Sequence, residues 1–503
     1  MIQSTHSSAT HGGTAGAPAT RLPVVPWLAA LGVALLGTWL LYDAWPGLNW
    51  PLCAAAAAGA FLWSERAGGR RPSVARSVPL ALAVALAGGV AVTAQPMLPG
   101  LIAVSLGMLA AVLALLSSGL PPRSLRPLVL CTAPLRAAAL CLASCAAQIH
   151  GAFVLARAER SVPMLRGALL ALVVGLAFFL LLSAADPTMG YWRDAARDSL
   201  LALSFLPRSV FFLVLAIFSL GILALAAQPS PAVAQDSLVP SQRPGLLRDI
   251  ERLMILGTVA AVFALFLLLQ VSYLFGNPGG RTGSGVTYAE AVHRGFGELT
   301  AAATLCLVLT LVLDRHAARG ARESLAMAVT LVLIGEAALL LVSAHLRLLA
   351  YEEAYGYTLQ RLYVHAHTFV TAVALALLAG EVCVSIDVGR LIRRLGLTVA
   401  LAVAILAYWN HAAWIARENI ARYQRTGIID VDYLAGGLGI DAVPEVIRNL
   451  PVLNGSLAQQ ARARLQAYRG EIPEQPRWYE WNLRRRAARQ ALAALPDASP
   501  AVN

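Results

Sequence analysis

The sequence predicts an all-α polytopic membrane protein, a helical bundle with about eleven spans and a small helical C-terminal appendage. Of its 503 residues, 58% are apolar and only 13% are charged, whereas a soluble domain has roughly 45–50% apolar and about 25% charged residues. The apolar residues are bunched into runs, and a helix that crosses a bilayer needs about 20 of them. Composition therefore excludes a soluble enzyme, a disordered chain and a small disulfide-built protein.

The charged and thiol residues exclude further classes. The net charge is +12, and every basic residue is arginine, which excludes a phosphate-loop lysine and Schiff-base chemistry. Arginine-rich cytoplasmic loops explain such a charge, so we expect the lipid bilayer as partner and no nucleic acid. All six cysteines fall in apolar segments without a Cys-x-x-Cys pair. We therefore expect no zinc site, no disulfide framework, no other metal and no cofactor.

The pattern of the first 127 residues predicts an N-terminal tail and four membrane spans. Residues 1–23 are rich in Ser, Thr, Gly and Ala and read as a disordered tail. The run Val24–Tyr42 lacks a cleavage site and is interpreted as a retained span. The linker at 65–76 holds four arginines, which predicts that it and the N-terminus are cytoplasmic. The four-span region 24–127 then has spans at about 24–42, 48–63, 77–94 and 97–117.

Residues 128–150 are apolar but predict an interfacial helix rather than a span. Arg136 lies in mid-segment, and both flanks are basic. An arginine at the centre of a bilayer costs at least ~2.5 kcal/mol. We therefore assign residues 128–165 to an interfacial cytoplasmic helix and a basic linker. If residues 128–150 do span, every later segment is inverted.

The remainder predicts a seven-span core at 166–415 and a helical appendage at 416–503. The core spans are expected at about 166–185, 207–227, 253–275, 296–313, 325–346, 364–384 and 397–415, which places the appendage outside. Within the appendage, residues 477–489 interleave Trp and Tyr with arginines. This pattern is typical of a helix on an anionic bilayer surface, and equally of a solvated amphipathic helix.

Polar residues collect in three segments that each adjoin a span end on the same predicted side. The first runs from Thr287 to Leu299, where Glu290, Arg294 and Glu298 recur at four-residue spacing and form one helical stripe. The second runs from Arg347 to Tyr363, and the third from Asn410 to Pro444. Charges buried this near a bilayer are tolerated when they pair. We therefore predict that the start of the 296–313 span, residues 347–363 and residues 408–425 meet in one polar cluster at the outer surface; the alternative is local pairing within each stripe.

The motifs in these segments resemble a known family. Tyr-Ala-Glu before Arg-Gly-Phe, Tyr-Gly-x-Thr-x-x-Arg, Ile-Ala-x-x-Asn-x-x-Arg-Tyr and Asp-Ala-Val-Pro are similar to motifs of the bacterial multipass family catalogued as domain of unknown function 4173. Ala185–Asp186–Pro187 is similar to a further signature of that family. The resemblance covers roughly residues 160–450 and implies an integral protein of the bacterial cytoplasmic membrane, without an activity to carry over. The family usually has an arginine where this chain has His293.

Glu336 lies near the middle of the 325–346 span, on the same face as Ser343 and Arg347. A carboxylate at this depth marks a functional site or forms a structural pair between helices. His365 and His367 are two residues apart on one helix and point about 200° apart, so they do not predict a shared metal.

Three functions are consistent with these residues. The favoured one is a transporter-like or ligand-binding protein with a polar cluster at the extracytoplasmic face and a small-molecule or protein partner there. The second is a membrane enzyme acting on an envelope or lipid-linked substrate, with Glu290, Glu352 or Asp186 as acid/base groups; without a nucleophile or metal signature it is less favoured, and no catalytic residue is assigned. The third is a scaffold or sensor-associated protein. The predicted site comprises Tyr288, Glu290, Arg294, Glu298, Glu336, Arg347, Tyr355, Thr358, Arg361, Asn410, Asn419 and Arg422.

Overall fold

The computed structural model describes residues 24–122, 125, 127–155, 205–228, 248–275, 301–314, 322–384 and 386–495, together with positions 171 and 175. All regular elements of this described part are helical, as predicted. The bundle contains α1 (Val24–Leu41), α2 (Asn49–Ala67), α3 (Val74–Val92), α4 (Met97–Ser117), α5 (Pro127–Cys131), α6 (Ala133–Leu155), α9 (Phe205–Ala227), α11 (Asp249–Phe275), a shorter helix at Ala301–Asp314, α13 (Glu323–Tyr355), α14 (Leu359–Val384) and α15 (Val388–Tyr408).

Eight helices of the described part are long and apolar enough to cross a membrane, namely α1, α3, α4, α9, α11, α13, α14 and α15. Three of the eleven predicted spans are not among them. The helix α2, predicted at 48–63, is rich in alanine and ends in a charged turn. The predicted span 296–313 is described only as the shorter helix Ala301–Asp314, and 166–185 lies outside the described residues.

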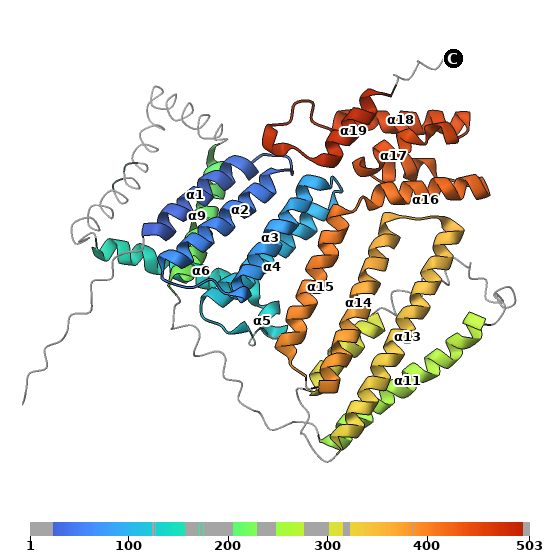
Figure 1. Ribbon diagram of the computed structural model, residues 1–503, viewed down its shortest axis with the longest axis horizontal. Helices are drawn as coiled ribbons and strands as arrows, with labels where there is room; N and C mark the ends of the chain where they lie inside the picture. Colours follow the sequence, from blue (N-terminus) through green and yellow to red (C-terminus); the bar gives the residue numbers. More distant parts are fainter. Residues whose placement is uncertain are drawn as a thin grey trace, which may run out of the picture.

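The helices form two groups joined through α15, as Figure 1 shows. One group contains α1–α4, α6 and α9, and the other contains α11, α13 and α14. Between them, Gly88 and Gly89 of α3 lie so close to Tyr408 and Ala407 of α15 that an added Cβ would be 2.4–2.6 Å from them. Small residues therefore allow the close approach that couples the groups.

The appendage comprises residues 411–495 and covers one end of the bundle (Figure 1). It contains α16 (His411–Thr426), η2 (Tyr433–Gly437), η3 (Ile440–Ala442), α17 (Val443–Arg448), η4 (Leu450–Val452), α18 (Gly455–Glu471), η5 (Trp478–Glu480) and α19 (Leu483–Ala493). Its core residues pack against Leu98, Leu362 and Leu406 of the bundle. The appendage is thus a packed helical unit seated on the bundle, and we call this side the appendage end.

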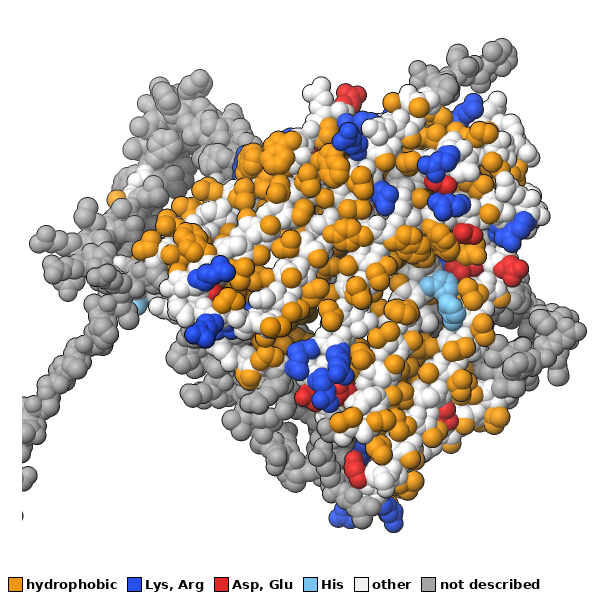
Figure 2. Space-filling model, in the orientation of Figure 1, with side chains coloured by type: hydrophobic (Ala, Val, Ile, Leu, Met, Phe, Trp, Pro, Cys, Tyr) orange, Lys and Arg blue, Asp and Glu red, His pale blue; other side chains and the backbone are white. Residues whose placement is uncertain are grey.

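The opposite side, which we call the arginine end, is where Arg70, Arg390 and Arg393 lie. The Arg70 guanidinium donates to the carbonyl oxygens of Ser117 at 3.1 Å and of Leu225 at 3.0 Å, so α4 and α9 both end here. Arg393 donates to the Pro122 carbonyl at 2.8 Å and joins α15 to this side. Figure 2 shows arginines beside acidic groups where α14 and α15 meet at this end. The helices α4 and α9, which lie before and after residues 128–150 in the chain, therefore end on the same side, as predicted.

The helix α6 packs against the last turns of α4 and α9. Cys141 of α6 is buried with Leu115 and Leu225, and an added Cβ at Gly221 would be 2.3 Å from the Cys141 carbonyl oxygen. The helix therefore lies at the arginine end, in tight contact with its neighbours. Its assignment as an interfacial helix stays a prediction.

Two predicted boundaries were wrong. The span predicted at 397–415 ends at Tyr408, because Trp409 is extended and the Asn410 side chain accepts the Ala413 N–H at 3.1 Å and so begins a new helix. The appendage therefore begins at 411 rather than 416. The segment predicted as a connection at 347–363 is mostly helix, because α13 continues to Tyr355 and α14 begins at Leu359.

Candidate functional site

The structure describes eight of the twelve predicted site residues. Tyr288, Glu290, Arg294 and Glu298 lie outside the described residues. The other eight lie on α13, on the turn to α14, on α14 itself and on α16 or its cap; they are Glu336, Arg347, Tyr355, Thr358, Arg361, Asn410, Asn419 and Arg422. The second and third polar segments can therefore be compared directly, and contact with the first stays a prediction.

The turn between α13 and α14 is held by side chains of α16. The Asn419 amide accepts the Tyr357 N–H and donates to the Tyr357 carbonyl, both at 2.8 Å. The Arg422 guanidinium donates to the carbonyls of Glu353 at 3.0 Å and Ala354 at 2.5 Å. Their partners are backbone groups left free where α13 ends. Asn419 and Arg422 thus bring the second and third segments together as a clamp on the turn.

Gly356 is required for this clamp. Its φ of 85° lies in the left-handed region, and an added Cβ would be 2.8 Å from the Asn419 Oδ1. The Tyr433 hydroxyl accepts the N–H of Leu359, the first residue of α14, at 2.8 Å. The Thr358 hydroxyl accepts the Arg361 N–H at 3.3 Å. Side chains of the appendage therefore bind specific backbone groups of the α13–α14 turn.

The remaining predicted residues on α13 and α14 have different surroundings. Arg361 donates to the Gly356 carbonyl and lies over the Tyr351 ring, 4.4 Å from its centroid. Tyr351 in turn contacts the exposed Tyr355 ring. Arg347 is half-buried and has polar contacts of its own. Arg361 therefore stabilises the turn between α13 and α14.

Glu336 lies near the middle of the 33-residue helix α13 and is half-buried. Its Oε2 is buried without a hydrogen-bond partner among the described residues. One turn earlier, the Cys306 thiol of helix Ala301–Asp314 contacts the Leu333 carbonyl at 3.9 Å. A carboxylate oxygen in this position is costly unless water, a proton or a ligand satisfies it.

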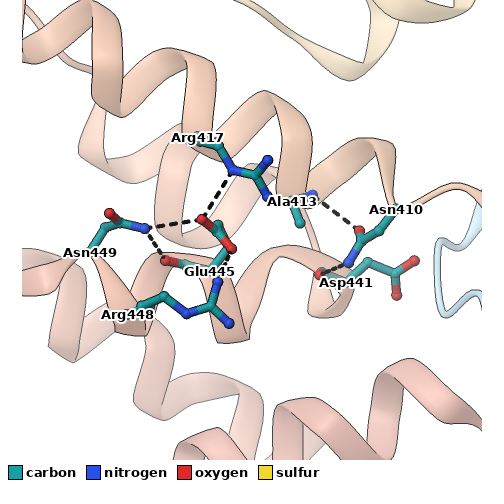
Figure 3. A network of polar contacts seen from close by, with 7 residues as sticks. All are labelled: Asn410, Ala413, Arg417, Asp441, Glu445, Arg448 and Asn449. Atoms are coloured by element: carbon teal, nitrogen blue, oxygen red, sulfur yellow. Dashed lines mark hydrogen bonds and ion pairs between the residues drawn. The ribbon is translucent and has the colours of Figure 1, made fainter.

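Asn410 belongs to a network between α16 and α17, drawn in Figure 3. Besides capping α16, its amide donates to the Asp441 carbonyl at 3.1 Å. Nearby, the Glu445 carboxylate accepts from Arg417 at 3.4 Å and from Arg448 at 2.5 Å. In Figure 3 the Asp441 carboxylate points away from this group, toward the α3–α4 loop. Asn410 is thus a structural residue of the appendage.

The Asp441 carboxylate joins the appendage to the bundle. It accepts the Thr93 hydroxyl and the Ala94 N–H, both at 2.9 Å, and is 3% exposed. Burial raises the pKa of this carboxyl to about 6, although the hydrogen bonds from Thr93 and Ala94 act in the opposite direction. Asp441 is therefore a buried acid that changes charge at mildly acidic pH.

A chain of titratable side chains joins α13 to α14, and sequence reasoning missed it. His365 Nε2 lies 2.9 Å from Glu352 Oε2, and His365 Nδ1 lies 3.1 Å from His345 Nδ1. Glu352 is 3% exposed. Figure 2 shows histidine side chains beside acidic ones where α13 and α14 approach the appendage. The signal was present in the sequence, since His345 and Glu352 are seven residues apart on one helix face and a turn at Gly356 places His365 opposite them.

The part of the chain that the structure describes contains no group of three or more His, Cys, Asp or Glu residues arranged to hold a metal ion. Two open grooves lie on the appendage. The larger, about 380 Å³, is lined by Leu48, Pro476, Arg477, Trp478 and Trp481, and the other, about 260 Å³, lies between α18 and α19. The larger groove opens beside the ends of α1 and α2, where aromatic side chains are typical of a membrane interface.

Residues 80–449 match the family described as Domain of unknown function (DUF4153), so the chain belongs to that family. The family number predicted from the motifs, 4173, was wrong, although the class of multipass proteins of unknown function is compatible. Comparison with curated proteins and with solved structures gave no match. With eight candidate spans among the described residues, the protein is a multipass integral membrane protein in contact with the lipid bilayer.

Proposed function

We propose that the protein is a transporter-like membrane protein of the bacterial cytoplasmic membrane that binds a small polar ligand from the appendage side, and that this is the extracytoplasmic side. The observation that carries the proposal is Glu336 in mid-helix, which has a buried carboxylate oxygen without a hydrogen-bond partner in the described part of the chain. At 1.5 Å per residue, α13 is roughly 50 Å long, so Glu336 lies deep within the bilayer. A carboxylate held there is typical of a substrate or ion path.

The other predicted residues take two roles in this proposal. Arg347 lies on the Glu336 face of α13, eleven residues nearer the appendage end. Together with residues 288–298 it would form the polar entrance to the ligand site. Asn419 and Arg422, whose partners are backbone carbonyls and amides, would fix the α13–α14 turn that frames this entrance.

Water access to Glu336 tests the proposal. In a chain whose six native cysteines are replaced by alanine, Glu336→Cys should react with a charged, membrane-impermeant methanethiosulfonate reagent, because a transport path is hydrated. Leu339→Cys is the matched control, since Leu339 is an apolar residue on the same helix and 57% exposed, where we expect lipid. It should not react. Failure of Glu336→Cys to react from either side of the membrane would contradict the proposal.

A membrane enzyme acting at the outer rim is the second candidate, and the contact between Glu352 and His365 favours it, because a carboxylate and a histidine form an acid/base pair. The two candidates differ in which glutamate they require. Glu336→Gln should abolish uptake by a transporter, whereas an enzyme at the rim should retain activity in Glu336→Gln and lose it in Glu352→Gln.

A further inference from the structure

The side chains of His345, His365 and Glu352 form a continuous hydrogen-bonded chain between two bundle helices. The His345 and His365 rings meet edge to face, with centroids 4.9 Å apart and planes at 75°. This geometry lets one Nδ1–H donate to the other Nδ1, so one of the two nitrogens must be unprotonated. The Glu352 carboxylate accepts from the opposite nitrogen of His365. Every link thus joins a proton donor to a proton acceptor.

We propose that this chain is a proton relay that conducts protons between the appendage end and the interior of the bundle. His345 and Glu352 are seven residues apart on α13, so the relay spans roughly 10 Å along the helix axis. The ligand class is therefore the proton, delivered from water. This proposal deepens the proposed function. It rests on that function only where it couples proton movement to transport.

The relay is balanced in protons at each step. Glu352 takes the proton from His365 Nε2, His365 Nδ1 takes the proton from His345 Nδ1, and His345 Nε2 takes a proton from water on its side. The product has a neutral carboxylic acid and both rings in the other tautomer, with every hydrogen bond kept and reversed. Loss of the carboxyl proton to water at the other end completes the transfer of one proton. Water-assisted tautomerisation then resets the chain, because each ring loses a proton from one nitrogen to water and gains one from water on the other.

The surroundings favour exchange of a proton over a fixed ion pair. The neighbouring helix α11 contributes the apolar side chains Phe263 and Leu267 next to Ala344. Arg361 is directed to the Gly356 carbonyl and the Tyr351 ring, and Arg422 to backbone carbonyls. His367 is exposed on the opposite side of α14. In the part of the chain that the structure describes, Glu352 pairs with His365.

Glu336 is a separate site. It is nine residues from His345, which places the two side chains on opposite faces of α13. The relay and the proposed ligand site can therefore fail independently, and an experiment on the histidines does not depend on Glu336.

Nitrogen NMR of ¹⁵N-histidine-labelled protein in liposomes tests the relay directly. The expected result is a scalar coupling between two Nδ1 nuclei across the hydrogen bond, present in the wild type and in His367→Phe and lost in His345→Phe and His365→Phe. On acidification the pair should take up one proton before the second. Glu352→Gln should keep the coupling while shifting the His365 Nε2 signal, which keeps the test open if a histidine variant fails to fold.

Three results would overturn the relay. The first is absence of the coupling in the wild type, and the second is simultaneous protonation of both rings. The third is stoichiometric binding of added Zn²⁺ that is lost in both histidine variants, which would assign the pair to a metal site.

A proton-flux measurement in liposomes loaded with a pH-sensitive dye separates the relay from transport. We expect proton flux to be lost in His365→Phe and kept in His367→Phe. If the coupling is present but neither the wild type nor any variant gives proton flux, the histidines share a proton but the chain does not conduct protons, and the relay is refuted.

Discussion

Glu381 and Glu352 are comparably buried carboxylates at opposite ends of the α13–α14 hairpin, 1% and 3% exposed, yet their partners differ. Glu381 accepts from Arg390 at 2.6 and 2.7 Å, from Arg394 at 3.3 Å and from the Asp387 N–H at 3.1 Å. Glu352 faces a histidine. Two guanidinium groups hold a carboxylate ionised, whereas an imidazole can exchange a proton with it. At one end of the α13–α14 hairpin the buried carboxylate therefore has fixed charges as partners, and at the other end its partner is a group that can exchange a proton.

The same contrast holds in a second pair of buried acids. At the arginine end Glu65, which is 0% exposed, accepts from Arg76. At the appendage end Asp441 accepts from a hydroxyl and a backbone N–H. A guanidinium partner favours the ionised form of a carboxylate, whereas at Asp441, whose direct partners are neutral donors, burial raises the pKa.

The largest expected effect comes from breaking the fixed charge. Glu381→Gln removes the buried carboxylate that accepts from two arginines and should lower the free energy of unfolding by about 3 kcal/mol, measured by denaturant titration in detergent micelles. Asp432→Asn is the matched control, because Asp432 also pairs with an arginine, Arg464, but both side chains are more than half exposed. It should change the free energy of unfolding only slightly. Equal losses in both variants would contradict the account.

The second effect is a pH dependence from Asp441. Its folded pKa of about 6 exceeds the ordinary value of 3.8, so the native state binds the proton more tightly than the unfolded state. The stabilisation is fully present below about pH 4, declines as pH rises to about 6 and is absent above it, a change of roughly 3 kcal/mol. Asp441→Asn should flatten this part of the stability profile. A profile that keeps its slope in the variant would assign the effect elsewhere.

A smaller effect is expected at the turn. Gly356→Ala forces a side chain into a φ of 85° and against Asn419, which should cost about 2 kcal/mol and loosen the appendage. Gly335→Ala on the same helix meets nothing within 4 Å and should be neutral or stabilising by up to about 1 kcal/mol. Thermal melting of both variants beside the wild type measures the difference. A Gly356→Ala protein as stable as Gly335→Ala would refute the clamp.

The sequence predicted those parts of the fold that depend on apolar runs. The helices at 24–42, 97–117 and 207–227 were predicted within a few residues of α1, α4 and α9, because a run of about 20 apolar residues is sufficient evidence of a spanning helix. The end of α15 was missed, since Trp409 and Asn410 interrupt the helix by backbone conformation and capping, which hydropathy does not register. Local polar signals therefore decided boundaries that composition could not.

The candidate site was predictable only in part, for a related reason. Asn419 and Arg422 were chosen for their polarity, and the structure directs both to the backbone of the α13–α14 turn. The partnership of Glu352 with His365 depends on the register of two helices, which is fixed by the three-residue turn at 356–358. Without that turn, a periodicity analysis considers each helix alone and cannot pair residues across a hairpin.

Infrared difference spectroscopy tests the central contrast between the two ends most directly, because a protonated carboxylic acid has its own carbonyl absorption. Spectra recorded as the pH is lowered stepwise should show a band of protonated carboxyl that is diminished in Glu352→Gln and unchanged in Glu381→Gln. A band lost in Glu381→Gln would show that the carboxylate at the arginine end exchanges protons, and a band unchanged in Glu352→Gln would show that Glu352 does not. Either result would contradict the account.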